Sequence, residues 1–335
     1  MKKDHKFIRN FFITVVILLT TTFFLNNLID PLWYNNGNKL TKVNYSWDER
    51  SQILNRFFKI IQTEKIDCLI FGSSTSTVLN VKKIQKYKCV NFSFSGGALD
   101  EYEAILIFIK KYVDPKIIII EVNFNLDKKN ILGNNLPNYI NLKNGEYNKR
   151  INYFKDYTSL KALIFSLKTL INKPDLLNVY DENFEPYVLK DKAKIYNKFI
   201  DLPISIKEEK DFNFYSNSKT YQSLKKLYPS AKFIGFIHPF HPKNAIAFYK
   251  LKKTNKYLKQ AYETSKNFDN FYDFAIPSKI NFNKENTYDG SHYYPHIYDL
   301  VIDRIFNQKK NNYGIVLSEK ERYFKQYFKA IKEFN

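Results

Sequence analysis

The chain contains few cysteines, and this scarcity excludes several classes of protein. Only Cys68 and Cys89 are present among its 335 residues. Two cysteines cannot by themselves form a metal site or the disulfide framework of a small secreted domain. Each lies in a short apolar run, where a free thiol packs as a small hydrophobic group. We therefore expect two buried thiols, with a disulfide as the alternative if the two runs form adjacent strands.

The chain also lacks concentrated runs of basic charge, although its overall charge is high. Lysine and arginine number 53 against 33 acidic residues, a formal net charge of +20, yet no run of five or more basic residues occurs. Such a charge favours anionic surfaces such as phospholipid headgroups, nucleic acid or acidic polysaccharide. Scattered lysines are typical of a solvated surface, and no nucleic-acid-binding module is recognisable. We expect no nucleic-acid partner.

One long apolar run lies at the N-terminus. Residues 11–29 are apolar except near their end, and their length nearly spans a hydrocarbon core of about 30 Å. Basic residues precede the run and little basic charge follows it, which predicts a cytoplasmic tail over residues 1–10. A cleaved signal peptide is the alternative, but no small-x-small cleavage site follows. We expect a single-pass anchor in the inner (cytoplasmic) membrane, a polar stalk over residues 30–45, and the rest of the chain on the periplasmic or extracytoplasmic side.

Beyond the stalk, short apolar runs alternate with helical patterns, which predicts an α/β domain over residues 46–312. Five runs are expected as strands, at residues 66–71, 89–94, 116–122, 232–237 and 270–276. The spacing of apolar residues predicts helices at residues 47–65, 99–112, 147–173, 244–268 and 295–307. Strands that alternate with helices form a mostly parallel sheet covered on both faces, and ligands bind at the carboxyl ends of its strands.

Two segments depart from this alternation. Residues of about 127–216 are expected to form an insertion, which either shapes a substrate groove or serves as a lid or partner-docking element. Residues 313–335 are expected to form a C-terminal helix that lies on the membrane or on the domain.

Small and polar residues follow the first and second expected strands. Gly72 permits a sharp turn, after which Ser74 would stand at a helix start, where backbone N–H groups and the helix dipole favour a developing oxyanion. A helix N-cap would look the same, so this pattern alone is weak. Gly96 follows the second strand, where its N–H could approach a carbonyl oxygen; a plain tight turn is the alternative.

Asp289 and His292 follow the last expected strand and precede the last helix of the domain. Gly290, between them, can bend the chain so that both side chains reach one site. There Asp289 would orient the imidazole, and His292 would accept the proton of a serine. With Ser74 they form a candidate Ser–His–Asp triad.

These motifs resemble the SGNH (GDSL-type) hydrolase superfamily over residues of about 66–133 and 218–306. The first block of that family is matched by Gly72-Ser73-Ser74, with Ser73 in place of the usual aspartate. The second block is matched by Gly96, although Gly97 could serve instead. The last block is matched by Asp289 and His292.

The third block of the family, Gly-x-Asn-Asp, is poorly matched. This chain has Glu121-Val122-Asn123-Phe124, so only Asn123 survives. The resemblance implies a flavodoxin-like three-layer sandwich with a mostly parallel five-stranded sheet, preceded by the transmembrane helix. It also implies that Ser74 is the nucleophile and that the oxyanion hole consists of the N–H groups of Ser74 and Gly96 and the Asn123 amide.

The resemblance is strongest to the membrane-anchored branch linked to acylation of cell-surface glycans and wall polymers. Its members also begin with one transmembrane helix, soon followed by an Asp-Pro pair like Asp30-Pro31. We therefore expect a serine esterase or O-acyltransferase, with acetyl as the acyl group that the resemblance implies. The expected partners are a cell-surface polysaccharide or acylated glycan and a membrane-bound acyl-donor protein.

The remaining histidines suggest no metal chemistry. His238 and His241 follow the fourth expected strand and so face the ligand side of the sheet, but a metal site would need a third ligand. We expect no metal and no cofactor, and we assign His238 to substrate contact or a structural role. Two alternatives to an enzyme that acylates or deacylates glycans are a catalytically inactive glycan-binding or assembly protein on the same fold and a lipid-directed esterase beside the membrane.

Overall fold

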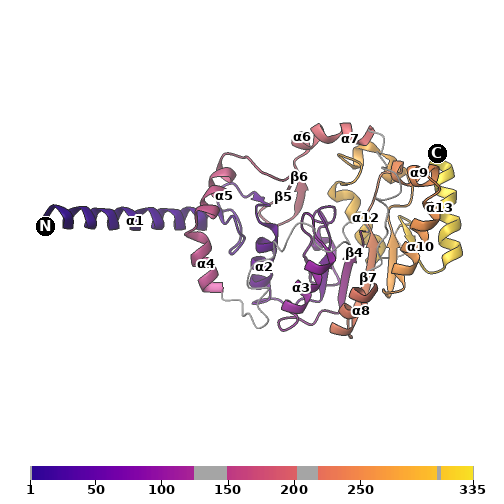
Figure 1. Ribbon diagram of the computed structural model, residues 1–335, viewed down its shortest axis with the longest axis horizontal. Helices are drawn as coiled ribbons and strands as arrows, with labels where there is room; N and C mark the ends of the chain where they lie inside the picture. The colour runs from indigo at the N-terminus through magenta and orange to yellow at the C-terminus, as the bar shows by residue number, and fades with distance from the viewer. Residues whose placement is uncertain (1, 124–148, 202–217, 308–310, 335) are drawn as a thin grey trace. The chain divides into compact units, whose positions relative to one another are not determined.

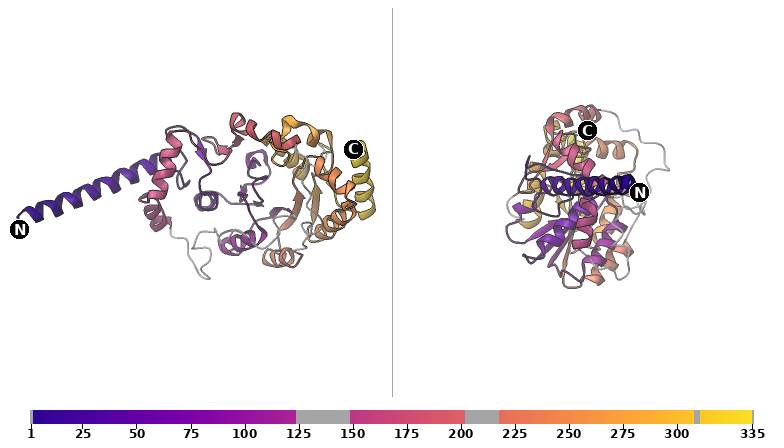
Figure 2. Two further views of the ribbon diagram at one scale, coloured as in Figure 1. Left: turned by 45° about the horizontal axis from the view of Figure 1, so that its top comes forward. Right: turned by 90° about the vertical axis from the view of Figure 1, so that its left-hand side faces the viewer.

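The chain folds into two compact units, which are described separately. The computed structural model describes residues 2–123, 149–201, 218–307 and 311–334 (Figures 1 and 2). The first unit consists of Met1–Gln62 and Pro137–Glu185, and the second of Thr63–Leu136 and Pro186–Asn335. Of the expected insertion over residues 127–216, the parts at 127–148 and 202–216 lie outside the described residues.

The first unit is mainly helical, with one short antiparallel strand pair. Its elements are α1 (Lys2–Ile29), β1 (Asn44–Tyr45), α2 (Glu49–Ile60), α4 (Lys149–Tyr157), α5 (Leu160–Leu170) and β5 (Asn178–Tyr180). Strands β1 and β5 pair through Asn44 with Tyr180 and Tyr45 with Val179. The stretch His5–Ile29 of α1 is long and apolar enough to cross a membrane, and only 11% of its most apolar window is buried. Such a helix could serve as an anchor or as a signal sequence.

Residues 30–45 do not form the expected polar stalk. Leu32, Trp33 and Tyr34 are at most 4% exposed and belong to the core of the first unit. The chain reverses directly after α1, where the Asp30 carboxylate accepts the N–H groups of Asn35 at 3.0 Å and Gly37 at 2.8 Å. The aromatic residues of this segment pack inward because the buried Asp30 holds the turn that returns them to the unit.

Two of the expected long helices are each interrupted. The helix expected over 147–173 is divided into α4 and α5, because the Ser159 side chain accepts the N–H of Ala162 and caps a new helix. In the second unit, the helix expected over 244–268 is divided into α9 (Lys243–Lys250) and α10 (Thr254–Ser265). There Lys252 adopts a left-handed backbone conformation, with φ of 57°, which no α-helix accommodates.

The second unit is built on a mixed, mostly parallel sheet of six strands, where five strands were expected. In spatial order these are β3 (Cys89–Asn91), β2 (Cys68–Phe71), β4 (Ile117–Glu121), β7 (Lys232–Ile237), β8 (Asn270–Asp273) and β9 (Ile315–Val316). The first five pair in parallel, and β9 pairs with β8 antiparallel. β9 was not predicted from the sequence, because a strand of two residues is too short to show an alternating pattern. The five parallel strands, numbered along the chain, run 2-1-3-4-5, the order of flavodoxin-like doubly wound sheets.

Helices of the second unit come mostly from the connections between these strands. They are α3 (Leu99–Ile109), α6 (Lys190–Ala193), α7 (Lys198–Asp201), α8 (Ser218–Leu227), α9, α10, α11 (Lys279–Phe282), α12 (Pro295–Phe306) and α13 (Lys320–Phe334). The same unit also contains the short strand β6 (Pro186–Val188) and the 3₁₀ turns η1 (Val81–Lys83), η2 (Lys194–Tyr196) and η4 (Lys284–Asn286). Successive strands are added across the sheet in one direction from β2 to β3 and in the other direction from β3 onwards. Right-handed crossovers therefore place the β2–β3 connection on one face of the sheet and the later connections on the other. Accordingly, α3 contacts α8, whereas Phe306 of α12 contacts Tyr87 of the β2–β3 connection.

The C-terminal helix α13 packs on the second unit. Tyr323, Tyr327 and Ile331, spaced along one face, are at most 2% exposed. The Tyr323 hydroxyl donates to the buried Asp273 carboxylate of β8 at 2.7 Å. Of the two expected locations for this helix, the domain surface is the observed one.

The expectation of two free thiols is wrong. Cys68 and Cys89 begin the neighbouring strands β2 and β3 and lie directly opposite each other in the parallel register, with their Cα atoms 4.3 Å apart. They form a disulfide. Strand adjacency and register, which set this distance, are properties of the sheet and cannot be read from either apolar run alone.

Candidate active site

Ser74 stands in a tight turn directly after β2. Gly72 allows this turn, because a Cβ there would lie 2.6 Å from the Ser76 side chain and 2.7 Å from Glu121 Oε2. From Phe71 to Asn80 every residue is buried except Ser74. The turn therefore presents one hydroxyl to solvent at the carboxyl end of the sheet.

The structure brings Ser74, His292 and Asp289 together in one hydrogen-bonded chain. Ser74 Oγ lies 2.9 Å from His292 Nε2, and His292 Nδ1 lies 2.7 Å from Asp289 Oδ2. The second oxygen, Oδ1, accepts the backbone N–H of Ser291 at 2.8 Å and of His292 at 2.7 Å. An ionised aspartate that accepts from Nδ1 leaves Nε2 free to accept the serine proton.

A short loop fixes the orientation of the imidazole. Thr287 and Tyr293 form an antiparallel bridge that closes the loop, and the Thr287 hydroxyl donates to the His292 carbonyl at 2.7 Å. Gly290 turns the chain with φ of +86°, in the region that favours glycine. The Tyr288 ring stacks on the imidazole at 5.4 Å between centroids. His292 is thus held both along its backbone and across its ring face.

The electrostatics keep Asp289 ionised. Partial burial raises the pKa of this carboxyl, but the hydrogen bonds and charge of His292 and the Ser291 N–H outweigh burial and lower the pKa below its usual value. The side chains of His292 and Asp289 are 28% and 19% exposed, so the pair remains reachable from solvent.

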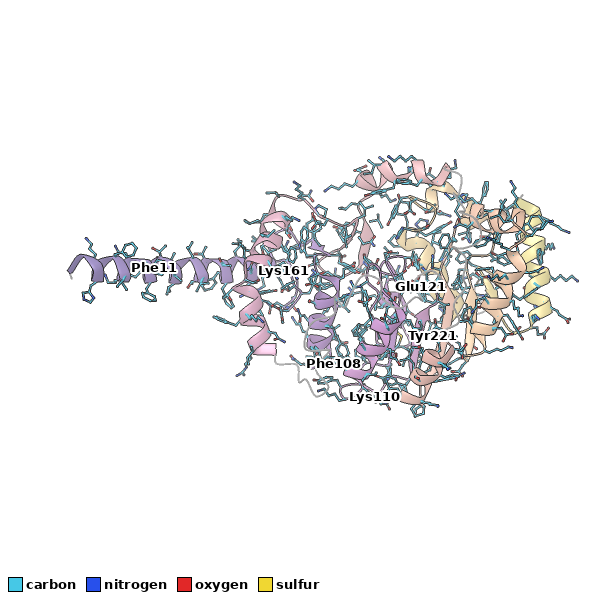
Figure 3. The ribbon with its side chains drawn as sticks, in the orientation of Figure 1. Phe11, Phe108, Lys110, Glu121, Lys161 and Tyr221 are labelled. Atoms are coloured by element: carbon cyan, nitrogen blue, oxygen red, sulfur yellow. A yellow bond between two sulfur atoms is a disulfide. The ribbon has the colours of Figure 1, made fainter. Side chains whose placement is uncertain are left out.

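Glu121, at the end of β4, anchors the turn that carries Ser74. Its carboxylate accepts Ser73 N–H at 3.0 Å, Ser73 Oγ at 2.8 Å, Thr75 Oγ1 at 2.8 Å and the Ser76 hydroxyl. The side chain, labelled in Figure 3, lies inside the second unit and is fully buried. The residues on both sides of Ser74 are therefore tied to one carboxylate, which holds the turn in place.

Glu121 is charged despite its burial. His238 Nδ1 lies 2.9 Å from its Oε1, and both side chains are at most 2% exposed. Burial raises the pKa of Glu121, but the facing imidazole and the hydroxyl donors outweigh burial and hold that pKa at about 2. His238, which was expected to contact substrate or serve a structural role, is the buried partner of this carboxylate.

The amino-acid sequence contains a signal for this network outside the motifs that resemble the SGNH superfamily. Glu121 ends a run of four isoleucines, and a carboxylate in a buried strand requires hydrogen-bond donors. The hydroxyl-rich segment from Ser73 to Ser76 supplies them. The glutamate that breaks the family pattern of the third block is thus a structural partner of the first block.

The expected oxyanion-hole residues follow the two strands that flank β2. Gly96 comes after β3 and Asn123 after β4, and both are partly exposed. Ile70 of β2 pairs with Ile119 of β4. Ser74 follows Ile70, and Asn123 follows Ile119, by the same number of residues along the chain.

Between the two candidate glycines, the hydrogen bonds favour Gly96. Gly97 is buried, and its N–H donates to the Phe94 carbonyl at 3.0 Å. A Cβ at Gly97 would also lie 2.8 Å from the Gly72 carbonyl, so this glycine is needed for close packing between the two turns.

Within the described ranges, no group of three or more histidine, cysteine, aspartate or glutamate residues is placed to hold a metal ion. The imidazole of His238 faces the Glu121 carboxylate, and that of His241 lies 5.5 Å from the Phe282 ring between centroids, tilted by 31°.

Comparison with known proteins adds little to this description. No family model matches the chain, and no curated protein matches it. Among solved structures, it is similar to "a putative platelet activating factor from Streptococcus pneumonia", with 12% identity over 78% of this chain and 92% of that chain and a TM-score of 0.37. It is also similar to "a putative acylhydrolase" from Bacteroides fragilis, with 13% identity over 78% of this chain and 98% of that chain and a TM-score of 0.35. These likenesses are too low to carry an argument, and the functional proposal rests on the geometry of the site.

Proposed function

We propose that the protein is an SGNH-type serine esterase or O-acyltransferase that works through a covalent acyl-enzyme. One observation carries the proposal: the continuous hydrogen-bonded chain from Ser74 Oγ through His292 to Asp289. Ser74 lies in one turn, and Asp289 and His292 lie in another; Ser74 and His292 are 218 residues apart in sequence. Ser74, at one end of the hydrogen-bonded series, is the one residue between Phe71 and Asn80 that is partly exposed. A capping serine has no need of such partners.

In the first step, Ser74 Oγ attacks the carbonyl carbon of an ester while His292 Nε2 takes the hydroxyl proton. Asp289 stabilises the imidazolium that forms. The N–H groups of Ser74 and Gly96 and the Asn123 amide are the proposed donors to the carbonyl oxygen as it becomes negative. When the tetrahedral intermediate collapses, the C–O bond to the alcohol breaks, and His292 returns its proton to the leaving alkoxide.

In the second step, a hydroxyl replaces the alcohol. His292 takes a proton from water or from a sugar hydroxyl, whose oxygen attacks the acyl carbon. The bond between the acyl carbon and Ser74 Oγ then breaks, and His292 returns the proton to Ser74 Oγ. Water as acceptor gives an esterase, and a sugar gives an O-acyltransferase. We propose an acetyl group, which only the resemblance to the SGNH superfamily implies. We propose a cell-envelope polysaccharide as substrate, because α1 suits an anchor that would keep the domain at the cell surface.

Fluorophosphonate labelling and hydrolysis of p-nitrophenyl acetate by the full-length protein in detergent test this proposal. We expect stoichiometric labelling of Ser74, and loss of both labelling and turnover in Ser74→Ala. The control is Ser223→Ala, at an exposed serine of α8 in the same unit, which should behave like the unmodified chain. Turnover that survives in Ser74→Ala, or the absence of any labelling, would contradict the proposal and favour an inactive glycan-binding protein.

A further inference from the structure

An exposed apolar stripe runs along α5, beside the base of the apolar helix α1. Leu160, Ile164, Leu167 and Ile171 are 70%, 43%, 48% and 68% exposed. Their spacing of four, three and four residues places them on one face of the helix. On α4, Ile151 and Phe154 are each 63% exposed. Scattered apolar residues on a surface are ordinary, but a continuous stripe of this kind indicates a covering partner.

The stripe lies opposite the face by which α5 attaches to its own unit. Phe165 stacks on Trp47 at 5.4 Å between centroids, and Thr169 Oγ1 accepts the Trp47 indole N–H at 3.0 Å. Ala162 and Ser166 of this inner face are fully buried. α5 therefore has one buried face that packs on the described residues of its unit and, opposite it, an exposed apolar face.

Helices α4 and α5 attach to the last turns of α1. Asn26 donates to the Tyr157 carbonyl at 2.9 Å and accepts from Ser166 Oγ at 2.7 Å, and it is fully buried. Phe23 contacts Tyr153 and Phe154 of α4 edge-on and tilted, respectively. Figure 1 and the left view of Figure 2 show α4 and α5 beside the C-terminal end of α1 and running across its axis.

If α1 crosses a bilayer, its contacts with α4 and α5 fix the depth of these two helices relative to the membrane. The apolar run of residues 11–29 is about as long as a hydrocarbon core is thick, at 1.5 Å per residue. Its last turns, which hold α4 and α5, then fall at the boundary between hydrocarbon and headgroups. A helix that crosses the axis of α1 at that level lies parallel to the membrane plane.

The charge around the stripe suits the same location. Between residues 149 and 175 there are six basic and two acidic residues. Lys161 and Lys168 border one side of the stripe, where they pair with Asp48 at 2.5 Å and with Asp175 at 2.9 Å, respectively. Their long side chains can exchange these partners for headgroup phosphates while their stems stay in apolar surroundings (Figure 3 labels Lys161). An apolar face bordered by lysines is the pattern of helices that bind membrane surfaces.

We propose that α4 and α5 form an interfacial collar, whose exposed face is covered by the lipid bilayer that α1 enters. Leu160, Ile164, Leu167 and Ile171 would lie at the boundary of the acyl chains, and the flanking lysines among anionic headgroups. The collar would fix the first unit against the membrane surface instead of leaving it to pivot on α1. This proposal does not depend on the chemistry proposed for Ser74.

Fluorescence quenching in vesicles tests the collar. The full-length chain is reconstituted at a low protein-to-lipid ratio in phosphatidylcholine and phosphatidylglycerol, with Ile164→Cys carrying an NBD label. The matched control is Ile107→Cys on α3, an isoleucine that is 58% exposed. The unsubstituted chain, whose two cysteines are joined, reports background labelling. Each sample is quenched by lipids with a nitroxide near the headgroup and, separately, by aqueous iodide.

We expect nitroxide lipids to quench the label at position 164 at least threefold more than the label at 107, and iodide to quench it correspondingly less. Leu167→Cys should repeat this result, so that a local defect in one variant cannot decide the outcome. Equal quenching at 164 and 107 by both agents would overturn the proposal. Protection from iodide without lipid quenching would overturn it as well, because it would identify a protein, either a second copy or another partner, on the stripe.

Discussion

Glu121 and Ser73 are joined by two hydrogen bonds, from Ser73 N–H to Oε2 at 3.0 Å and from Ser73 Oγ to Oε1 at 2.8 Å. Ser74 is the next residue, so the carboxylate fixes the backbone immediately before the proposed nucleophile. His238, the residue directly after β7, faces the same carboxylate, and the positions of three strand ends are thereby coupled. A nucleophile must be held within about half an ångström of its productive position, and this buried group supplies the constraint.

Replacement of Glu121 by glutamine should therefore affect both stability and activity. The amide keeps one acceptor oxygen but loses the charge that faces His238. Its NH₂ group would face hydroxyls that donate to the Glu121 carboxylate in the unmodified chain. Removal of one partner of a buried pair costs about 3 to 5 kcal/mol. We expect a fall of that size in the free energy of unfolding in urea, and a lower kcat for p-nitrophenyl acetate in the folded protein at low temperature.

The control for this variant is Glu263→Gln on α10, whose side chain is 45% exposed and pairs with Lys266 at 2.7 Å. An exposed pair contributes at most about 1 kcal/mol, so this variant should stay close to the unmodified chain. If Glu121→Gln unfolds at the same urea concentration as Glu263→Gln, the anchoring role is wrong.

Asp289→Asn should abolish most of the activity without disturbing the fold. An asparagine amide can donate to His292 Nδ1, which would leave Nε2 protonated and unable to accept the serine proton. The expected loss in kcat is about 10³- to 10⁴-fold. Stopped assays with p-nitrophenyl acetate measure it, and Asp299→Asn on α12 serves as a neutral control. A rate within a few-fold of the original would remove Asp289 from the mechanism.

Asp273 should make the second unit less stable as the pH rises. Burial raises the pKa of this carboxyl from 3.8 to about 6, against the opposing effect of the Tyr323 hydroxyl. The folded state therefore holds its proton more tightly than the unfolded state. The contribution of Asp273 to the free energy of unfolding is fully present below pH 3.8 and is lost as the pH rises through about 6. This loss amounts to on the order of 3 kcal/mol.

Asp273→Asn removes this titration, so the variant should gain stability relative to the unmodified chain between about pH 4 and pH 7. Urea unfolding at both pH values measures the gain. Asp269→Asn supplies a control of opposite sign. Burial raises the pKa of Asp269, but Lys225 and the Phe233 N–H outweigh it and lower that pKa. Asp269 therefore contributes stability that is present above pH 3.8 and is lost as the pH falls below it, so Asp269→Asn should remove this loss at low pH and show little pH dependence of its own between pH 4 and pH 7. Parallel pH curves for Asp273→Asn and the unmodified chain would show that Asp273 is not perturbed.

The disulfide between Cys68 and Cys89 should stabilise the second unit. It closes a loop with a sequence separation of 21, for which the chain-entropy model predicts about 3 kcal/mol. Dithiothreitol should lower the urea midpoint of the unmodified chain but leave that of Cys68→Ala/Cys89→Ala unchanged. Mass spectrometry after alkylation without reductant should find no modified cysteine. Two alkylated cysteines in freshly isolated protein would contradict the bridge.

Local patterns predicted the sheet well. Lys232–Ile237 was expected as a strand and is β7 in full, and Ile117–Glu121 lies within the run expected over 116–122. Runs of β-branched residues between turn signals have few other ways to be buried. Helix boundaries inside long amphipathic stretches were predicted less well. The breaks at Ser159 and Lys252 depend on a capping hydrogen bond and on one backbone conformation, and neither disturbs the apolar spacing.

The strand runs, the apolar N-terminal helix and the candidates Ser74, Asp289 and His292 could be predicted from the amino-acid sequence, because each depends on a few neighbouring residues. The contacts that these residues make depend on the three-dimensional fold. Strand register joined Cys68 to Cys89, and the parallel strand ends brought Glu121 to Ser73 and His238. The folding of the first unit turned the expected stalk inward while it left one face of α5 exposed. Such contacts depend on the distance between segments far apart in the chain, and no local pattern encodes that distance.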